Sequence, residues 1–374
     1  MKYIFTSILF LTTISTFSQS VARNEQPEIN QTRTVFIDPK FKSEIQKAEK
    51  LVMILMKEKN IPGLSISVST KDKVIWSQGF GFSDLENKIP VKINSKFRIG
   101  SVSKTLTTLA IGKLLENNRL KLSDNIRDFV PYFPAKAYTI SVRELANHTS
   151  GIRAYNNGEY LSYKNYESVK KSIDVFKEDS LAFKPNTKYL YSTYGYVLLS
   201  AVIEGATSMN FTDYMRDSIF VPLNLKNTLP DNPYEIIDNR VRFYDKVDGA
   251  IINSPAVDNS NKWAGGGYLS TPFDLVTICR SLMNNTFLKE STKQKLWTPN
   301  TLDDGQHTDY GLGWRMDKDN FNRYFVHHGG SSVGGRSFLL AYPNDGICIA
   351  LTSNLSDSFD QSFVLKLAGL FLNK

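Results

Sequence analysis

The first clear pattern in the chain is helical. Between residues 38 and 59, apolar side chains recur three or four positions apart and lysines fill other positions, as in a helix with one buried face. The apolar stripe consists of Ile45, Ala48, Leu51, Val52, Leu55 and Met56. The segment 60–63, Asn-Ile-Pro-Gly, ends this helix. Two apolar runs, 64–70 and 74–80, follow around a short charged turn and predict a β-hairpin.

The last third of the chain has strand patterns again. Short apolar or alternating runs occupy residues 310–316, 324–328, 336–342 and 347–353, and a helix is expected from 360 to 372. The segment between the two strand-rich regions has short helical runs, many turns and several tyrosines. Together these patterns predict an α/β (α+β) fold, in which an antiparallel sheet is flanked by helices and carries an inserted, mainly helical subdomain.

The predicted division of the chain follows from these patterns. We place the α/β sheet subdomain at 38–99 and 271–374 and the helical subdomain at 100–270, with a ligand cleft between them. Within the helical part, Ser141 and Glu144 predict a capping box at the start of a short helix. The apolar run from Tyr196 to Glu204 predicts a longer helix that Gly205 closes.

The N-terminus resembles a targeting segment. Residues 1–20 combine one lysine, a short apolar run and a small-residue end, which indicates a cleavable signal peptide and export, in a bacterium to the periplasm. The run is too short for an ordinary transmembrane span, so no stable membrane anchor is expected after cleavage. An uncleaved anchor is the alternative. Residues 21–37 are polar and predict a loose segment.

Composition narrows the function classes. The 374 residues are 41% hydrophobic, enough for a large core, and the net charge of +8 comes from lysines scattered among acidic residues rather than gathered in a patch. Nucleic acid is therefore not an expected partner. With four histidines and no ligand-spaced cluster, no catalytic metal or other cofactor is expected. Cys279 and Cys348 are expected to be buried thiols, and their spacing does not settle whether they pair.

The chemistry centres on residues 97–115. Ser101 and Lys104 are three positions apart at the start of a helical pattern, so the lysine amine can reach the serine hydroxyl. This arrangement places a base beside a nucleophile. The alternative is that Ser101 only caps the helix and Lys104 is solvated.

Four later segments carry candidate residues or structural alternatives. Tyr191 stands just before an apolar helix, where it either packs or moves protons next to a lysine. His148 lies in a turn and is interpreted as a turn residue rather than a catalyst. The segment 263–267, Trp-Ala-Gly-Gly-Gly, is expected to be a flexible turn. His327 and His328 are adjacent in a strand, so at most one of them faces a given cleft.

Taken in order, three motifs resemble those of the serine β-lactamase and penicillin-binding-protein superfamily, in the form found in class C enzymes. They are S-V-S-K at 101–104, Y-S-T at 191–193 and H-H-G at 327–329. Four longer segments are most similar to the mitochondrial β-lactamase-like serine protease family and its bacterial relatives. These segments are F-R-I-G-S-V-S-K, L-A-N-H-T-S-G-I-R, Y-S-T-Y-G-Y-V-L-L-S and A-G-G-G-Y-L-S-T. The resemblance spans residue 40 to the C-terminus and implies a β-lactamase/transpeptidase-like fold.

The resemblance also implies residue roles. Ser101 would attack a carbonyl to form an acyl-enzyme, and Lys104 and Tyr191 would share the proton transfers. His327 would line the cleft and hold Tyr191 or a substrate carboxylate. The backbone N–H groups of Ser101 and Gly330 would form the oxyanion hole. Substrate-binding positions would be Thr193, His328 and Gly329.

Two departures from the family pattern weigh against an efficient β-lactamase. Histidine replaces lysine in the third motif, and an ordinary histidine is mostly neutral at pH 7. Thr193 replaces an asparagine, which removes an amide that could bind a peptide-like substrate. The prediction is therefore an exported serine hydrolase that acts on small peptides or esters through an acyl-enzyme. The alternatives are a β-lactamase or D-alanyl-D-alanine carboxypeptidase, and a non-catalytic protein that binds cell-wall peptides. Nothing in the sequence predicts an oligomeric state.

Overall fold

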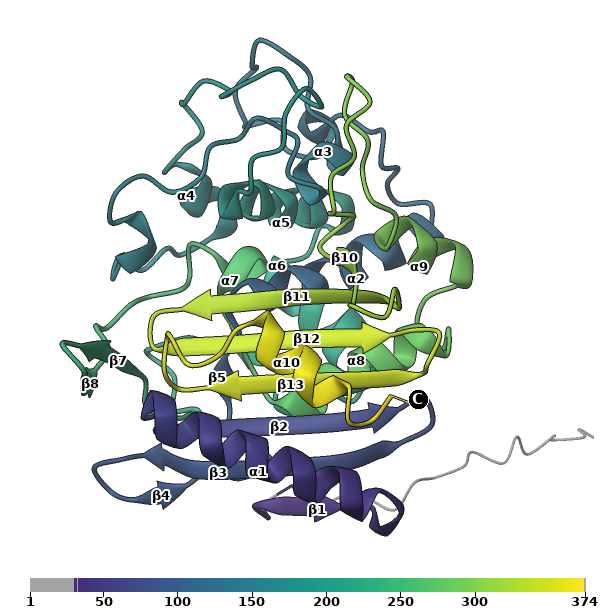
Figure 1. Ribbon diagram of the computed structural model, residues 1–374. Helices are drawn as coiled ribbons and strands as arrows, with labels where there is room; N and C mark the ends of the chain where they lie inside the picture. The colour runs from purple at the N-terminus through teal and green to yellow at the C-terminus, as the bar shows by residue number, and fades with distance from the viewer. Residues whose placement is uncertain (1–29, 32, 373–374) are drawn as a thin grey trace, which may run out of the picture.

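An antiparallel sheet forms the centre of the computed structural model, which describes residues 30–31 and 33–372 (Figure 1). Its strands lie in the order β1 (Val35–Ile37), β3 (Val74–Asp84), β2 (Gly63–Thr70), β13 (Ile347–Ser353), β12 (Gly335–Tyr342), β11 (Tyr324–Ser332) and β10 (Arg315–Lys318), and β4 (Ile89–Pro90) pairs with β3. The first and last thirds of the chain thus build one sheet, as predicted. The predicted signal peptide, residues 1–20, lies outside the described residues.

Two smaller sheets accompany the large one. The first consists of β5 (Phe97–Arg98), β9 (Tyr268–Ser270) and β6 (Leu229–Pro230). The second is the hairpin of β7 (Tyr244–Val247) and β8 (Ala250–Asn253), which projects to one side in Figure 1. Both matter for the site, because β5 leads into the Ser101 segment and β7 reaches the cavity next to it.

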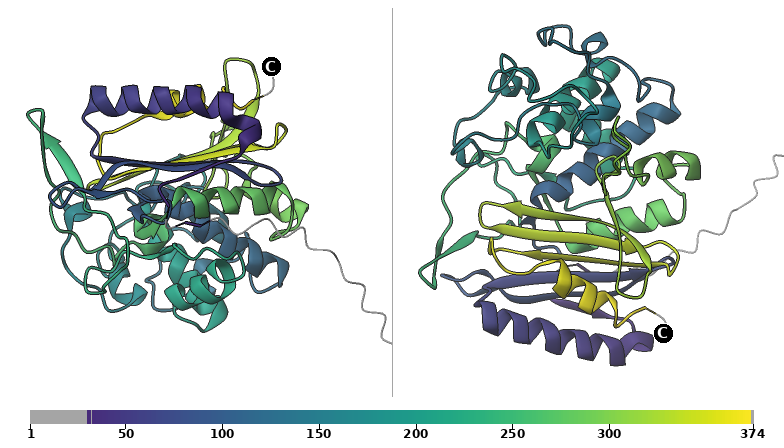
Figure 2. Two further views of the ribbon diagram at one scale, coloured as in Figure 1. Left: turned by 90° about the horizontal axis from the view of Figure 1, so that it is seen from below. Right: turned by 45° about the horizontal axis from the view of Figure 1, so that its top comes forward.

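Helices cover both faces of the large sheet. The α-helices are α1 (Lys42–Lys59), α2 (Ser103–Glu116), α3 (Val142–Ala146), α4 (Val169–Ile173), α5 (Thr193–Thr207), α6 (Phe211–Met215), α7 (Trp263–Gly266), α8 (Pro272–Met283), α9 (Glu290–Leu296) and α10 (Gln361–Ala368). Short turns of 3-10 or π-helix are η1 (Pro39–Phe41), η2 (Gly100–Val102), η3 (Ile126–Asp128), η4 (Glu159–Leu161) and η5 (Arg216–Phe220). Figure 2 shows α1 on one side of the sheet and the helices of the middle segment on the other.

The two faces of the sheet bury different residues. Along β13, Ile349 and Leu351 join the apolar cluster under α1 and α10, whereas Cys348 and Ala350 join the cluster that includes α8 and α2. This alternation is the period of two that a strand imposes, and both sets are apolar because both faces are covered. The same alternation of side chains decides which residues of β11 face the site.

Most local predictions are confirmed. The 64–70 and 74–80 runs form the β2–β3 hairpin. The predicted first helix corresponds to η1 and α1, which Asn60 ends in a left-handed conformation with φ of 54°. Ser141 and Glu144 form the complete capping box at α3. Cys279 and Cys348 are buried free thiols.

Three local predictions are wrong. Gly205 does not close α5, which continues to Thr207 because Ser208 supplies the left-handed cap. The segment 263–267 is not a flexible turn, since most of it forms the short helix α7. The strand expected at 310–316 is reduced to β10, which begins at Arg315.

The division into subdomains at 99/100 and 270/271 stays a prediction.

Among the described residues, none of the helices combines the length and apolar content that crossing a bilayer requires.

Candidate active site

Ser101 lies in the η2 turn, which leads directly into α2. Its side chain caps neither helix, because the N-cap positions belong to Ile99 and Val102 and neither end has a side-chain cap. Gly100 precedes it with φ of 48°, a conformation that glycine adopts without strain. A Cβ atom on Gly100 would lie 2.4 Å from the carbonyl oxygen of Ser331, so glycine also lets β11 approach the turn closely.

Lys104 is the base candidate and is completely buried on the first turn of α2. Its Nζ lies 3.3 Å from the Oγ of Ser101 and donates a hydrogen bond of 2.6 Å to the carbonyl of Gly265. Burial lowers the pKa of Lys104 well below its usual value, and the nearby Arg315 guanidinium lowers it further. An amine with a lowered pKa can take the proton of the Ser101 hydroxyl at neutral pH.

The backbone of α7 completes this arrangement. Gly265 presents its carbonyl to Lys104, and a Cβ atom on Gly265 would lie 2.5 Å from the Cγ2 of Thr193. The buried hydroxyl of Thr107 on α2 donates to the carbonyl of Ala264 at 2.8 Å. These contacts hold α7 against α2 and α5 and so fix the lysine amine beside the serine.

Tyr191 lies next to the amine of Lys104. The Nζ of Lys104 is 4.7 Å from the centroid of its ring. Burial raises the pKa of Tyr191, and its hydrogen bond with the Ser101 side chain opposes part of that increase. The phenol is therefore protonated at neutral pH and can donate a proton to a leaving group.

His148 holds Tyr191 in place, a role that the sequence did not indicate. Its carbonyl accepts a hydrogen bond from the N–H of Leu190 at 2.9 Å, and its Nδ1 accepts one from the N–H of Ser192 at 3.2 Å. Its ring centroid is 4.2 Å from that of Tyr191. His148 does occupy a turn, with φ of 65°, as interpreted from the sequence. The contact with Tyr191 spans more than forty positions, so no local pattern could have revealed it.

The protonation state of His148 also bears on the site. Burial lowers its pKa well below the usual value, and the positive charge of Arg315 acts in the same direction. Its Nε2 has no hydrogen-bond partner among the described residues. His148 is thus a neutral ring packed beside Tyr191.

The structure contradicts the prediction that His327 lines the cleft. Its ring stacks on Phe338 at 5.4 Å with an interplanar angle of 7°, and Phe338 belongs to the apolar cluster under α1 and α10. His328, the next residue of β11, points to the other face, where its Nε2 lies 2.9 Å from the hydroxyl of Tyr310. Its ring centroid is 6.2 Å from that of Tyr191. The alternation of the strand therefore brings the second histidine to the site.

The predicted oxyanion-hole segment of β11 packs directly on the η2 turn. A Cβ atom on Gly330 would lie 2.0 Å from the carbonyl oxygen of Ile99, which explains why glycine occupies this position. The residues of β11 that line the cavity together with Ser101 are Ser331 and Ser332, and Gly330 is not among the lining residues.

A cavity of about 530 Å³ opens at Ser101. It is lined by Ser101, Tyr155, Tyr160, Leu161, Thr193, Asp245, Pro255, Lys262, Gly265, Gly266, Ser331, Ser332, Val333 and Ser356. Of the predicted substrate-binding positions, Thr193 lines this cavity, whereas His328 and Gly329 do not. A volume of this order accommodates a small organic substrate.

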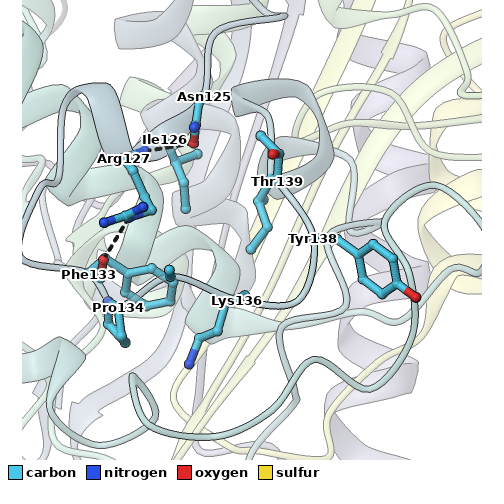
Figure 3. Close-up of a pocket in the computed structure, with 10 residues that line it drawn as sticks. Asn125, Ile126, Arg127, Phe133, Pro134, Lys136, Tyr138 and Thr139 are labelled. Atoms are coloured by element: carbon cyan, nitrogen blue, oxygen red, sulfur yellow. Dashed lines mark hydrogen bonds between the residues drawn. The ribbon is translucent and has the colours of Figure 1, made fainter.

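A second pocket lies within residues 125–140 (Figure 3). Its volume is about 70 Å³, and none of the candidate catalytic residues lines it. Arg127 crosses it to donate a hydrogen bond to the carbonyl of Phe133. The reaction is therefore assigned to the larger cavity.

Comparison with known proteins identifies the family. The sequence model of the β-lactamase family matches residues 48–370. The chain belongs to the β-lactamase family. Family membership implies a serine hydrolase that works through an acyl-enzyme, which confirms the predicted enzyme class.

Individual proteins of related sequence also match most of this β-lactamase family member. The human mitochondrial serine β-lactamase-like protein LACTB is 29% identical, over 88% of this chain and 80% of its own length. Penicillin-binding protein 4* of Bacillus subtilis (strain 168) is 28% identical, over 79% of this chain and 69% of its own length.

Solved structures show the same fold. An octameric penicillin-binding protein homologue from Pyrococcus abyssi has a TM-score of 0.77 at 23% identity, and the match covers 88% of this chain and 78% of that one. A D-amino acid amidase from Ochrobactrum anthropi SV3 also has a TM-score of 0.77, at 20% identity, over 88% of this chain and 98% of that one. The predicted β-lactamase/transpeptidase-like fold is thereby confirmed.

Proposed function

We propose that this β-lactamase family member is an exported hydrolase of peptide or ester bonds whose nucleophile is Ser101. The observation that carries the proposal is the completely buried Lys104 amine, 3.3 Å from the Oγ of Ser101 at the opening of a cavity of about 530 Å³. Export is supported only by the signal-peptide pattern of residues 1–20.

The proposed acylation step uses three side chains. Lys104 takes the proton of the Ser101 hydroxyl while Oγ attacks the substrate carbonyl, giving a tetrahedral intermediate with a negative oxygen. Tyr191 donates its phenolic proton to the leaving amine or alcohol as the carbonyl reforms, and recovers a proton from Lys104. Water then attacks the acyl-enzyme by the same proton path, which releases the acid and restores Ser101.

The oxyanion would be held by two backbone N–H groups. We assign them to Ser101 and Ser331, in place of the predicted Gly330, because Ser331 lines the cavity with Ser101. The loss of one such donor commonly costs about 3 kcal/mol of transition-state stabilisation.

A substrate that carries a carboxylate, such as a β-lactam or a D-alanyl peptide, defines the second candidate function. One observation favours it. The guanidinium of Arg315 lies 5.8 Å from the Tyr191 ring centroid and 5.2 Å from that of Tyr310, so a permanent positive charge stands beside the site. It compensates for the neutral His328, whose pKa is lowered well below its usual value by burial.

The decisive test is covalent labelling by a fluorophosphonate probe, together with turnover of p-nitrophenyl esters and of a peptide panel. We expect Ser101→Ala to abolish labelling and to reduce turnover by several orders of magnitude, because the nucleophile is removed. The matched control is Ser103→Ala, at the start of α2, because the hydroxyl of Ser103 accepts a hydrogen bond from the N–H of Tyr268.

The outcomes separate the candidates. Labelling and turnover of Ser101→Ala at the wild-type level, with the fold intact, would contradict the assignment of the nucleophile. Serine-dependent turnover of nitrocefin, or labelling by a fluorescent penicillin, would favour the second candidate. Binding of cell-wall peptides without turnover of any substrate would favour the non-catalytic alternative.

A further inference from the structure

One wall of the cavity carries a carboxylate that the proposed reaction does not use. Asp245 of β7 is the single acidic residue among the described residues that line the cavity. The lining of the cavity also includes apolar and aromatic residues, among them Tyr155, Leu161 and Val333. A carboxylate in such surroundings is a strong determinant of which ligand charge is tolerated.

The carboxylate is held in a fixed orientation. Its Oδ1 accepts a hydrogen bond from the hydroxyl of Ser356, and the same hydroxyl accepts one of 2.8 Å from the N–H of Gly334. Gly334 has φ of 68° in the turn that follows β11, the strand that carries Ser331. Asp245 is thus tied to the element that forms the other side of the reaction centre.

The negative charge of Asp245 has no partner within the described part of the chain. Its Oδ2 accepts no hydrogen bond there, and no lysine, arginine or histidine of that part forms an ion pair with it. The half-buried position of Asp245 leaves this oxygen open to a ligand in the cavity. An oriented carboxylate with one unoccupied oxygen is suited to a charge-assisted hydrogen bond with an ammonium group.

The other charged lining residue, Lys262, does not neutralise Asp245. Its Nζ donates a hydrogen bond of 2.8 Å to the carbonyl of Tyr160. Burial lowers the pKa of Lys262 to about 8, and the carboxylates that oppose this shift are Asp231 and Asp258. Lys262 therefore has acidic neighbours of its own, and Asp245 remains without a counter-charge.

We infer that Asp245 binds a cationic group of the substrate, so that the cavity selects peptides or esters that carry an ammonium group separated from the scissile carbonyl by an apolar segment. The apolar segment would contact the aromatic and aliphatic wall, and the ammonium would pair with Asp245. The inference rests on the proposed function, because it takes Ser101 as the place where this substrate reacts.

The experiment has a binding arm and a kinetic arm. In the first, n-hexylammonium and the neutral n-hexanol are titrated into wild-type protein, Asp245→Asn and Asp248→Asn, with binding followed by calorimetry and by Tm. Asp248 lies in the turn of the same hairpin, is exposed, and does not line the cavity, so its variant is the matched control. In the second arm, p-nitrophenyl esters of ω-aminoalkanoic acids of increasing length are compared with their uncharged counterparts.

We expect wild type and Asp248→Asn to bind the ammonium about tenfold more tightly than the alcohol, which corresponds to about 1.4 kcal/mol, and Asp245→Asn to lose this preference. The kcat/KM ratio of charged to uncharged ester should fall in the same way. Equal affinity of Asp245→Asn and wild type for n-hexylammonium, or no preference for it in wild type, would overturn the inference. If ammonium binding depends on Asp245 but no ester or peptide is hydrolysed, the proposed function fails and the binding site stands.

Discussion

Individual side chains of the site owe their protonation states to burial. Lys104 and His148 are completely or almost completely buried, and burial lowers the pKa of both. Burial raises the pKa of Tyr191 instead, because the charged form of a phenol is the anion. An amine with a lowered pKa and a protonated phenol beside Ser101 form a matched base and acid.

At this scale, His148 acts as a positioning residue. We expect His148→Asn to lower kcat by roughly 10 to 100-fold with little change in KM, because a small displacement of Tyr191 impairs proton transfer without altering the cavity wall. Asparagine tolerates the φ of 65° and keeps a hydrogen-bond acceptor near the position of Nδ1, but removes the ring that packs on Tyr191. Steady-state kinetics with a p-nitrophenyl ester measure both constants.

The control for this prediction is His327→Asn. His327 is also a buried histidine, but its ring stacks on Phe338 away from the site. It should keep the wild-type kcat even where its Tm falls. Equal kcat losses in the two variants would show that any buried histidine of the fold has the same effect, and the positioning role of His148 would be wrong.

The secondary-structure elements place these side chains through close backbone contacts. The β11 strand runs over the η2 turn, and α7 packs against α2 and α5, in each case at a glycine. In α5 the same device occurs at Gly205, where a Cβ atom would lie 2.2 Å from the carbonyl oxygen of Phe129. Gly205 is therefore a packing residue within the helix, not the helix end that the sequence predicted.

The packing role of Gly205 predicts that alanine at this position destabilises the protein, which is the opposite of what helix propensity alone predicts. Alanine normally stabilises a helix interior relative to glycine by up to about 1 kcal/mol. We expect Gly205→Ala to destabilise the protein by about 1 to 3 kcal/mol, because the new Cβ atom would meet the backbone carbonyl of Phe129, which would have to move. Urea unfolding measures the difference.

Gly195, near the start of the same helix, is the matched control. A Cβ atom there would lie 3.5 Å from the carbonyl oxygen of Leu145, an ordinary contact distance. Gly195→Ala should therefore be neutral or stabilising. A gain in stability for both variants would show that the α5 contact with Phe129 is not close enough to matter.

For the molecule as a whole, burying Lys104 makes the stability of the fold depend on pH. Its pKa lies well below 10.5 in the folded chain and near the ordinary value in the unfolded chain. Between the two values the unfolded chain binds more protons, so the free energy of unfolding rises with pH. The contribution from one such lysine reaches about 1.4 kcal/mol per pH unit.

The test compares wild type with Lys104→Met by urea unfolding across the neutral to alkaline range. The free energy of unfolding of wild type relative to the variant should rise steadily with pH and level off above 10.5, the ordinary pKa of lysine. A difference that is the same at every pH would mean that Lys104 is charged in the folded protein. Lys104 would then not be the base of the proposed reaction.

The sequence by itself determined much of the local structure and the order of the three motifs. The stripe of α1, the β2–β3 hairpin and the capping box of Ser141 and Glu144 follow from the period and the end signals of each element, which neighbouring residues encode. The pairing of Ser101 with Lys104 was predictable for the same reason, because both residues lie on one turn of backbone.

Only the tertiary structure decided what lies across from each element. Strand alternation predicts that His327 and His328 face opposite sides, but which side holds the site depends on what covers each face of the sheet. The contact of His148 with Tyr191 and the presence of Asp245 in the wall of the Ser101 cavity likewise join segments far apart in the chain. Period and end signals say nothing about such partners, since the side chains meet only when the sheet and helices pack.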